Sequence, residues 1–207
     1  LTPSSLLKAK LGEAPNITHY TTELTSDAPK ETVEETGNYL AELLEKEMTS
    51  LMLADVNVCV VTSGGLDSSY LTALASKYHD NLHSFNIWYE GDWPQDERQY
   101  AVEVAKRYQT THHQVIVKEK NFVDIIQNMV KHIGQPNSAP HCLSTFALFQ
   151  TIKEAGFKVA LTGEGADEFF GGYTRFATAA NDTQPNWLNT YLDKLSAATK
   201  SQRDELY

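Results

Sequence analysis

Long apolar runs, paired cysteines and an excess of positive charge are all missing from this sequence of 207 residues. No run is long enough to span a membrane, and Leu6-Leu7 is too short for the apolar part of a signal peptide. The two cysteines, Cys59 and Cys142, lack the paired spacing of a metal site. These absences predict a cytoplasmic protein with no membrane partner and no disulfide framework.

The charge balance argues against nucleic acid as a partner. Lys and Arg number 17 against 27 Asp and Glu, which gives a net charge of −10, and no basic cluster offsets it. Proteins that bind nucleic acid depend on basic patches that contact phosphates. An anionic small molecule can still bind where backbone dipoles and a metal ion supply positive potential locally.

Short apolar runs alternate with amphipathic stretches along the chain. The runs predict strands over residues 56–61, 82–89, 115–117 and 157–162. Helical periodicity predicts helices over residues 33–51, 68–78, 96–108, 121–133 and 143–155. The run around Cys59 is apolar throughout, which is typical of a strand covered on both faces. The alternation predicts an α/β fold, a doubly wound parallel sheet with helices on both faces.

Several local signals mark where the helices begin and end. Asp96, with Gln99 three residues later, predicts an N-terminal capping box, and Gly134 predicts a helix end. Asp27 followed by Pro29 is a further helix-start signal.

The segment Ser63-Gly64-Gly65-Leu66-Asp67-Ser68-Ser69 follows the first predicted strand. Consecutive glycines allow a sharp turn that presents backbone N–H groups to an anion, and the serine hydroxyls add donors. A carboxylate beside phosphate is repelled unless a cation bridges them, so Asp67 implies Mg²⁺. The alternative is an ordinary strand–turn–helix connection with Asp67 as a helix cap.

This first loop resembles the PP-loop of the ATP pyrophosphatases, Ser-Gly-Gly-x-Asp-Ser. A second loop, Thr-Gly-Glu-Gly-Ala-Asp-Glu-Phe-Phe-Gly-Gly-Tyr at 162–173, resembles that of the asparagine synthetase family. The resemblance spans roughly residues 30–180 and includes Asp96-Glu97 and Thr111-His112-His113. Two long motifs in the same order make it specific.

The resemblance implies a fold of the PP-loop type, with ATP and Mg²⁺ as cofactors. The implied reaction activates the side-chain carboxylate of aspartate as an acyl-adenylate, with release of pyrophosphate. Ammonia then attacks to give asparagine and AMP. The domains it implies are a linker or trailing segment over 1–25, an ATP pyrophosphatase domain of the asparagine synthase type over 26–180, and an incomplete C-terminal helical segment over 181–207.

The resemblance also assigns roles to individual residues. The Mg²⁺ ligands it implies are Asp67 and Asp167, and the pyrophosphate cradle is Ser63, Gly64, Gly65 and Ser68. The positions that contact adenosine are Val61, Ile87, Thr162 and Gly163. Glu164 matches a glutamate that assists the ammonia step, and together with Asp67 and Asp167 it completes the expected catalytic set.

The chain also departs from the family pattern. It begins at Leu1, without the N-terminal cysteine of a glutaminase, so we expect no glutaminase activity and an ammonia supply from a domain or subunit absent from this chain. Neither Lys194 nor Lys200 matches the family's downstream catalytic lysine. Gln135 precedes Pro136 where the family commonly has an acidic residue, which leaves the acceptor acid open.

Other functions remain as alternatives. These are an amidotransferase of secondary metabolism acting on another carboxylic acid and a catalytically silent ATP-binding subunit. Glu164 argues against β-lactam-forming relatives, and the missing basic face and zinc cysteines argue against a tRNA-modifying enzyme. Formation of a homo-oligomer is left open.

Two further features have ordinary explanations. His112 and His113 are neighbours on a strand, so we expect them on opposite faces, packing or hydrogen bonding near the site. Arg175 is expected to form a surface salt bridge.

Overall fold

The computed structural model describes residues 4–20, 31–93, 96–137, 139–181, 191 and 200–206. The chain divides into two compact units, Leu1–Glu42 and Leu43–Tyr207. The first unit contains an antiparallel hairpin of β1 (Ser5–Lys8) and β2 (Asn16–His19), where the sequence predicted only a linker or trailing segment. Both strands are short and largely exposed, so they leave no alternation of apolar and polar residues to recognise.

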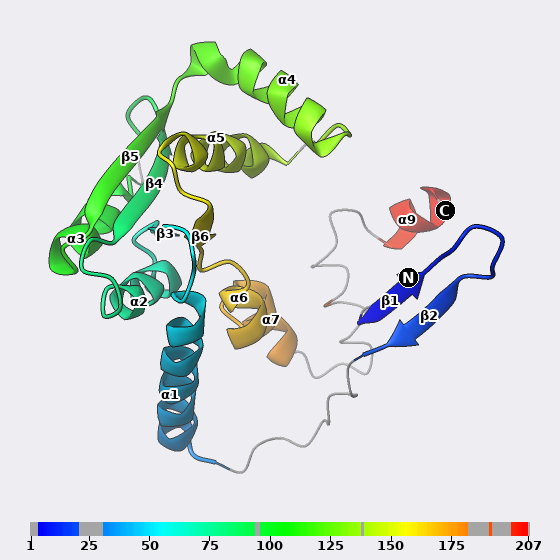
Figure 1. Ribbon diagram of the computed structural model, residues 1–207, viewed down its shortest axis with the longest axis horizontal. Coiled ribbons are helices and arrows are strands. Elements are labelled where there is room, and N and C mark those ends of the chain that lie inside the picture. The colour runs from blue at the N-terminus through cyan, green and yellow to red at the C-terminus, as the bar shows by residue number, and fades with distance from the viewer. Residues whose placement is uncertain are drawn as a thin grey trace. The chain divides into compact units, whose positions relative to one another are not determined.

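The second unit is organised around a parallel sheet (Figure 1). Its strands are β3 (Val58–Val61), β4 (His83–Tyr89), β5 (Thr111–Val117) and β6 (Val159–Leu161), in the order β5-β4-β3-β6. The chain moves outward from β3 to β5 and then returns to the other side of β3. The strand order therefore reverses between β3 and β6, the position at which open α/β sheets bind ligands.

Helices precede, connect and follow these strands, and the first of them begins within the first unit. They are α1 (Val33–Leu51), α2 (Leu66–Ala75), α3 (Arg98–Arg107), α4 (Phe122–Ile133), α5 (Pro140–Glu154), α6 (Ala166–Phe170), α7 (Thr174–Ala180) and α9 (Lys200–Leu206), with a 3₁₀ turn, η1 (Glu119–Asn121), before α4. None of the helices in the described part of the chain is long and apolar enough to cross a membrane.

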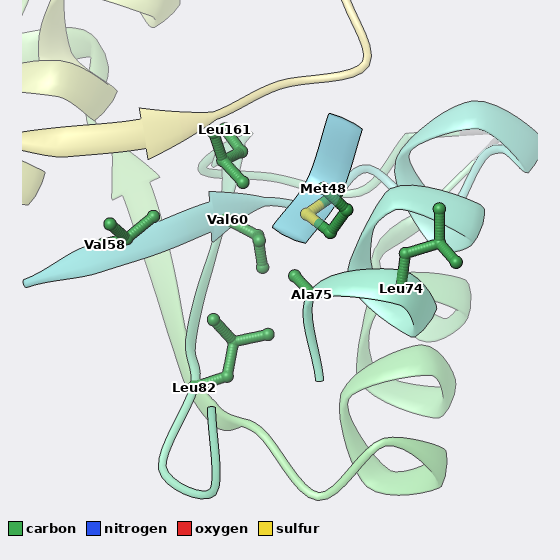
Figure 2. Packing of buried hydrophobic residues seen from close by; sticks show 7 residues of the cluster. All are labelled: Met48, Val58, Val60, Leu74, Ala75, Leu82 and Leu161. Atoms are coloured by element: carbon green, nitrogen blue, oxygen red, sulfur yellow. The ribbon is translucent and has the colours of Figure 1, made fainter. Parts of the chain in front are cut away.

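Alternate side chains of β3 enter two different cores. Val58 and Val60 pack on one face against α1 and α2 through Met48 and Leu74 (Figure 2). Cys59 lies on the other face, in a cluster with Phe85 of β4, Leu148 and Ile152 of α5, and Phe157. Burial raises the pKa of the Cys59 thiol to about 12, which leaves it unreactive. Helices on both faces of the parallel sheet confirm the predicted fold class.

The predicted helix boundaries are only partly correct. Gly134 ends α4 in the left-handed conformation, with φ of 79°, as predicted. The capping box at Asp96 is wrong, because Glu97 is the N-cap of α3 and has no side-chain cap. The Asp96 carboxylate instead binds the guanidinium of Arg98 and accepts from the Arg98 backbone N–H. The signal at Asp27 and Pro29 lies outside the described residues.

The histidines of β4 and β5 form two hydrogen-bonded groups on opposite faces of the sheet. His83 Nδ1 lies 2.8 Å from His113 Nε2, and the His113 ring stacks on Phe85. His112 Nδ1 lies 2.9 Å from Ser84 Oγ. The opposite faces confirm the prediction. The strand register places His112 and His113 level with Val60 and Val61, the last two residues of β3.

This cluster predicts that the protein loses stability as the pH falls. Burial, followed by repulsion from His113, lowers the pKa of both His83 and His112. The unfolded chain then binds more protons than the folded chain below the ordinary histidine pKa of about 6.5, so stability is complete above that pH and is lost below it. Urea unfolding at about pH 7.5 and about pH 5.5, roughly one unit either side of that value, measures the loss.

A substitution separates this effect from general acid denaturation. His112→Asn retains a polar atom near Ser84 and should reduce the difference in unfolding midpoint between the two pH values. His132→Asn on the exposed surface of α4 should leave the difference as in the wild type. Equal pH dependence in all three proteins would show that the cluster does not control it.

Candidate functional site

The first glycine-rich loop connects β3 to α2 and lies against α3. Gly64 has a φ of 87°, and a Cβ at this position would lie 2.5 Å from Tyr100 Cβ and 2.6 Å from the Ala101 backbone nitrogen. Both the backbone conformation and the contact therefore require glycine. The turn of the loop therefore packs directly against α3 at Tyr100 and Ala101.

The two serines of this loop bind each other and the backbone. Ser63 Oγ lies 3.0 Å from Ser68 Oγ and accepts a hydrogen bond from the Gly65 N–H. Ser68 Oγ accepts from the Ser63 N–H and lies within hydrogen-bond distance of the Gly65 carbonyl. Gly65 is the N-cap of α2, and no side chain caps this end of the helix. The helix therefore begins with N–H groups that an anion can bind.

The second glycine-rich loop follows β6 and contacts the first. A Cβ on Gly163 would lie 3.1 Å from the Ser68 nitrogen and 3.3 Å from Asp67 Cβ, so the absence of a side chain allows the loops to approach closely. Gly165, with φ of 91°, is the N-cap of α6, the short helix that carries Asp167. The sheet thus brings together two motifs about a hundred residues apart (Asp67 and Asp167).

Both loops line one cavity of about 680 Å³. The predicted site residues on its wall are Val61, Ser63, Gly65, Asp67, Ser68, Thr162, Gly163, Glu164 and Asp167. Gly64 and Ile87 are not on the wall. Gly64 is the part of the loop that lies against α3, and Ile87 packs against the core cluster that contains Phe85.

The described wall of this cavity is acidic. Asp67, Glu164, Asp167 and Glu168 contribute carboxylates, and no described lining residue is Lys or Arg. Among the described residues no group of three or more His, Cys, Asp or Glu side chains could hold a metal ion. Two carboxylates nevertheless fit Mg²⁺, which proteins bind through one or two carboxylates together with substrate phosphates. The donor set fits a metal that arrives with a nucleotide.

Several residues of the site carried no recognisable signal in the sequence. Asn86 of β4 is buried and donates from Nδ2 to the Thr62 carbonyl at 3.0 Å, which fixes the end of β3 just before the first loop. The opposite wall of the cavity comes from Met129 and Ile133 of α4 and from Phe146 and Phe149 of α5. Their helical spacing is that of core residues, so sequence reasoning assigns them to packing.

Tyr173 and Arg175 lie beyond α6. The Tyr173 hydroxyl donates to Glu168 Oε1 at 2.8 Å, and this hydrogen bond raises the pKa of Tyr173. The Arg175 guanidinium stacks 3.8 Å from the centre of the Tyr173 ring. The described part of the chain gives Arg175 no ion pair, so the predicted salt bridge is wrong, and cation–π stacking takes its place.

The fold and the site define a class. This is a doubly wound α/β protein with two glycine-rich loops and an acidic cavity at the point where the strand order reverses. Residues 39–206 match the asparagine synthase family, and the chain belongs to that family.

Curated relatives agree with this assignment. The chain is 29% identical to asparagine synthetase [glutamine-hydrolyzing] 3 of Bacillus subtilis over 195 residues, 87% of this chain and 32% of that protein. It is 33% identical to asparagine synthetase B [glutamine-hydrolyzing] of Escherichia coli over 171 residues, 75% of this chain and 30% of the relative. The chain thus spans about a third of the length of these relatives.

Among solved structures, the chain is similar to the U34-tRNA thiolase NcsA of Methanococcus maripaludis. The TM-score is 0.45 at 17% identity, over 70% of this chain and 54% of the other.

Proposed function

We propose that this chain is the ATP-using part of an enzyme that forms asparagine from aspartate and ammonia. The observation that carries the proposal is the contact of Gly163 with Asp67 and Ser68, which joins both loops at one acidic cavity. Membership of the asparagine synthase family supports the substrate class. The two relatives described above are named as glutamine-hydrolysing asparagine synthetases, which supports ammonia from a glutaminase as the nitrogen source.

The first half-reaction makes the carboxylate reactive. An oxygen of the aspartate side chain attacks the α-phosphorus of ATP, the bond from that phosphorus to the bridging oxygen breaks, and pyrophosphate leaves. N–H groups at the start of α2 and the loop around Gly65 bind the phosphates. Mg²⁺, when bound with the nucleotide by Asp67 and Asp167, would neutralise the charge that develops on pyrophosphate.

The second half-reaction forms the amide. Ammonia attacks the acyl carbon of β-aspartyl-AMP, the nitrogen loses a proton, and the bond to AMP breaks. Glu164 faces the cavity between Gly163 and Gly165, and its carboxylate is the proposed proton acceptor.

A different acceptor acid is the second candidate. Aspartate carries two carboxylates, and the described wall of the cavity has no Lys or Arg to bind the one that is not activated. An acid with a single carboxylate and an apolar body would suit the wall formed by Ile133, Phe146 and Phe149. Comparing carboxylic acids as substrates for adenylate formation decides between the two candidates.

The metal requirement supplies a direct test of the site. Asp67→Asn should weaken binding of Mg·ATP by at least tenfold, because it removes a charged metal ligand, while binding of metal-free AMP should change little. Titration calorimetry with each nucleotide measures both affinities. The matched control is Asp80→Asn, at an exposed turn before β4, which should alter neither. Equal losses of Mg·ATP and AMP in Asp67→Asn would show that Asp67 supports the loop itself and binds no metal.

A further inference from the structure

Asp167 lies in a short helix whose following residues fold back and hydrogen-bond to it. It is the second residue of α6, a helix of five residues that ends at Gly171 in the left-handed conformation, with φ of 69°. The chain then folds back, and the Gly172 N–H donates to the Asp167 carbonyl at 3.1 Å. The hydrogen bond from Tyr173 to Glu168 spans the same turn. The backbone on both sides of Asp167 is therefore held in place.

The Asp167 carboxylate lies directly against Gly172. A Cβ on Gly172 would overlap Asp167 Oδ1 and lie 3.0 Å from Asp167 Cγ. The φ of Gly172 is outside the left-handed region, so the backbone conformation does not demand glycine. A side chain at residue 172 would therefore require the Asp167 carboxylate to move. The neighbouring Gly171 is the reverse case, because its φ is left-handed and a Cβ there would meet only Phe176 Cβ, at 3.9 Å.

We propose that Gly172 is a positioning residue for Asp167. Its bare Cα forms the surface on which the carboxylate rests, and this contact fixes the direction in which the Asp167 oxygens face the cavity. A methyl group at residue 172 would push the carboxylate into another rotamer or open the turn. The inference rests on the proposed function, in which Asp167 is a ligand of the metal that accompanies ATP.

A double-substitution cycle tests the proposal, with Gly172→Ala, Asp167→Ala and the two combined. The first readout is the melting temperature without metal or nucleotide. Gly172→Ala should lower it by about 1–6 °C, the shift expected when one side chain is forced off its rotamer in a chain of this size. In the Asp167→Ala background the same methyl group meets no carboxylate, so the further shift should vanish.

The second readout is the Mg²⁺ concentration that half-saturates ATP binding. Gly172→Ala should raise it by about 10–100-fold, the usual effect of disturbing a group that orients a metal ligand. In the Asp167→Ala background Gly172→Ala should add nothing. If Asp167→Ala itself leaves the Mg²⁺ dependence unchanged, the metal assignment in the proposed function is wrong, whereas the melting cycle still tests the contact.

The control is Gly171→Ala. It introduces backbone strain without touching the carboxylate, so it should lower the melting temperature equally in the wild-type and Asp167→Ala backgrounds. Equal shifts for Gly172→Ala in both backgrounds would show that Gly172 serves only the turn. If Gly172→Ala fails to fold, a folded double variant supports the proposal, and an unfolded double variant overturns it.

Discussion

Replacing Glu164 by Gln should slow amide formation by about 10²–10⁴-fold, the usual contribution of one general base. The nitrogen of ammonia becomes more acidic as it bonds to the acyl carbon, and the Glu164 carboxylate is the proposed acceptor of its proton. Adenylate formation should continue, because the attacking carboxylate is already ionised at neutral pH and needs no base. Product formation and pyrophosphate exchange, measured on the same variant of the intact protein, separate the two steps.

The matched control is Glu103→Gln on the exposed surface of α3, which should change neither rate. A parallel collapse of exchange and amide synthesis in Glu164→Gln would contradict the division of labour. Glu164 would then act in nucleotide binding or in the structure of the second loop.

Among substitutions in the first loop, Gly64→Ala should cause the largest loss of stability. Its φ of 87° strains any residue with a Cβ, and that Cβ would also collide with the backbone of α3 at Tyr100 and Ala101. Strain of about 1–2 kcal/mol and overpacking of about 1–3 kcal/mol together predict a loss of about 2–5 kcal/mol in unfolding free energy. The displaced loop should also lose at least tenfold in affinity for Mg·ATP.

Gly156→Ala is the comparison that isolates the collision. Gly156 has a φ of 91°, but nothing lies within 4 Å of a Cβ there, so only the strain applies. Urea unfolding should show a smaller loss of stability for Gly156→Ala than for Gly64→Ala. Nucleotide titration should show an unchanged affinity for Gly156→Ala. Similar losses in the two variants would mean that the contact with α3 is unimportant.

The sheet could be predicted from sequence because its central strand is apolar on both faces. Val60 and Cys59 are neighbours that enter different cores, as expected of a strand with helices on both faces of its sheet. The hairpin over residues 5–19 could not be predicted, because strands as exposed as β1 and β2 show no apolar pattern. Asp96 was predicted to cap a helix, but the sequence did not reveal that Arg98 competes for its carboxylate.

The candidate site was predictable in its loops but not in its walls. Ser63, Asp67, Glu164 and Asp167 stand in recognisable motifs, and all four line the cavity. Gly172 also stands in a motif, yet its role depends on the rotamer of Asp167, which the sequence does not encode locally.

The measurement that tests the central claim most directly is isotope exchange between pyrophosphate and ATP, catalysed by the intact protein. The proposed chemistry predicts that label enters ATP only when Mg²⁺ and the acceptor acid, aspartate, are both present. Adding ammonia should then yield asparagine, AMP and pyrophosphate in equal amounts. Formation of ADP and inorganic phosphate instead, or exchange that proceeds without any carboxylic acid, would contradict the claim that this site activates a carboxylate as its adenylate.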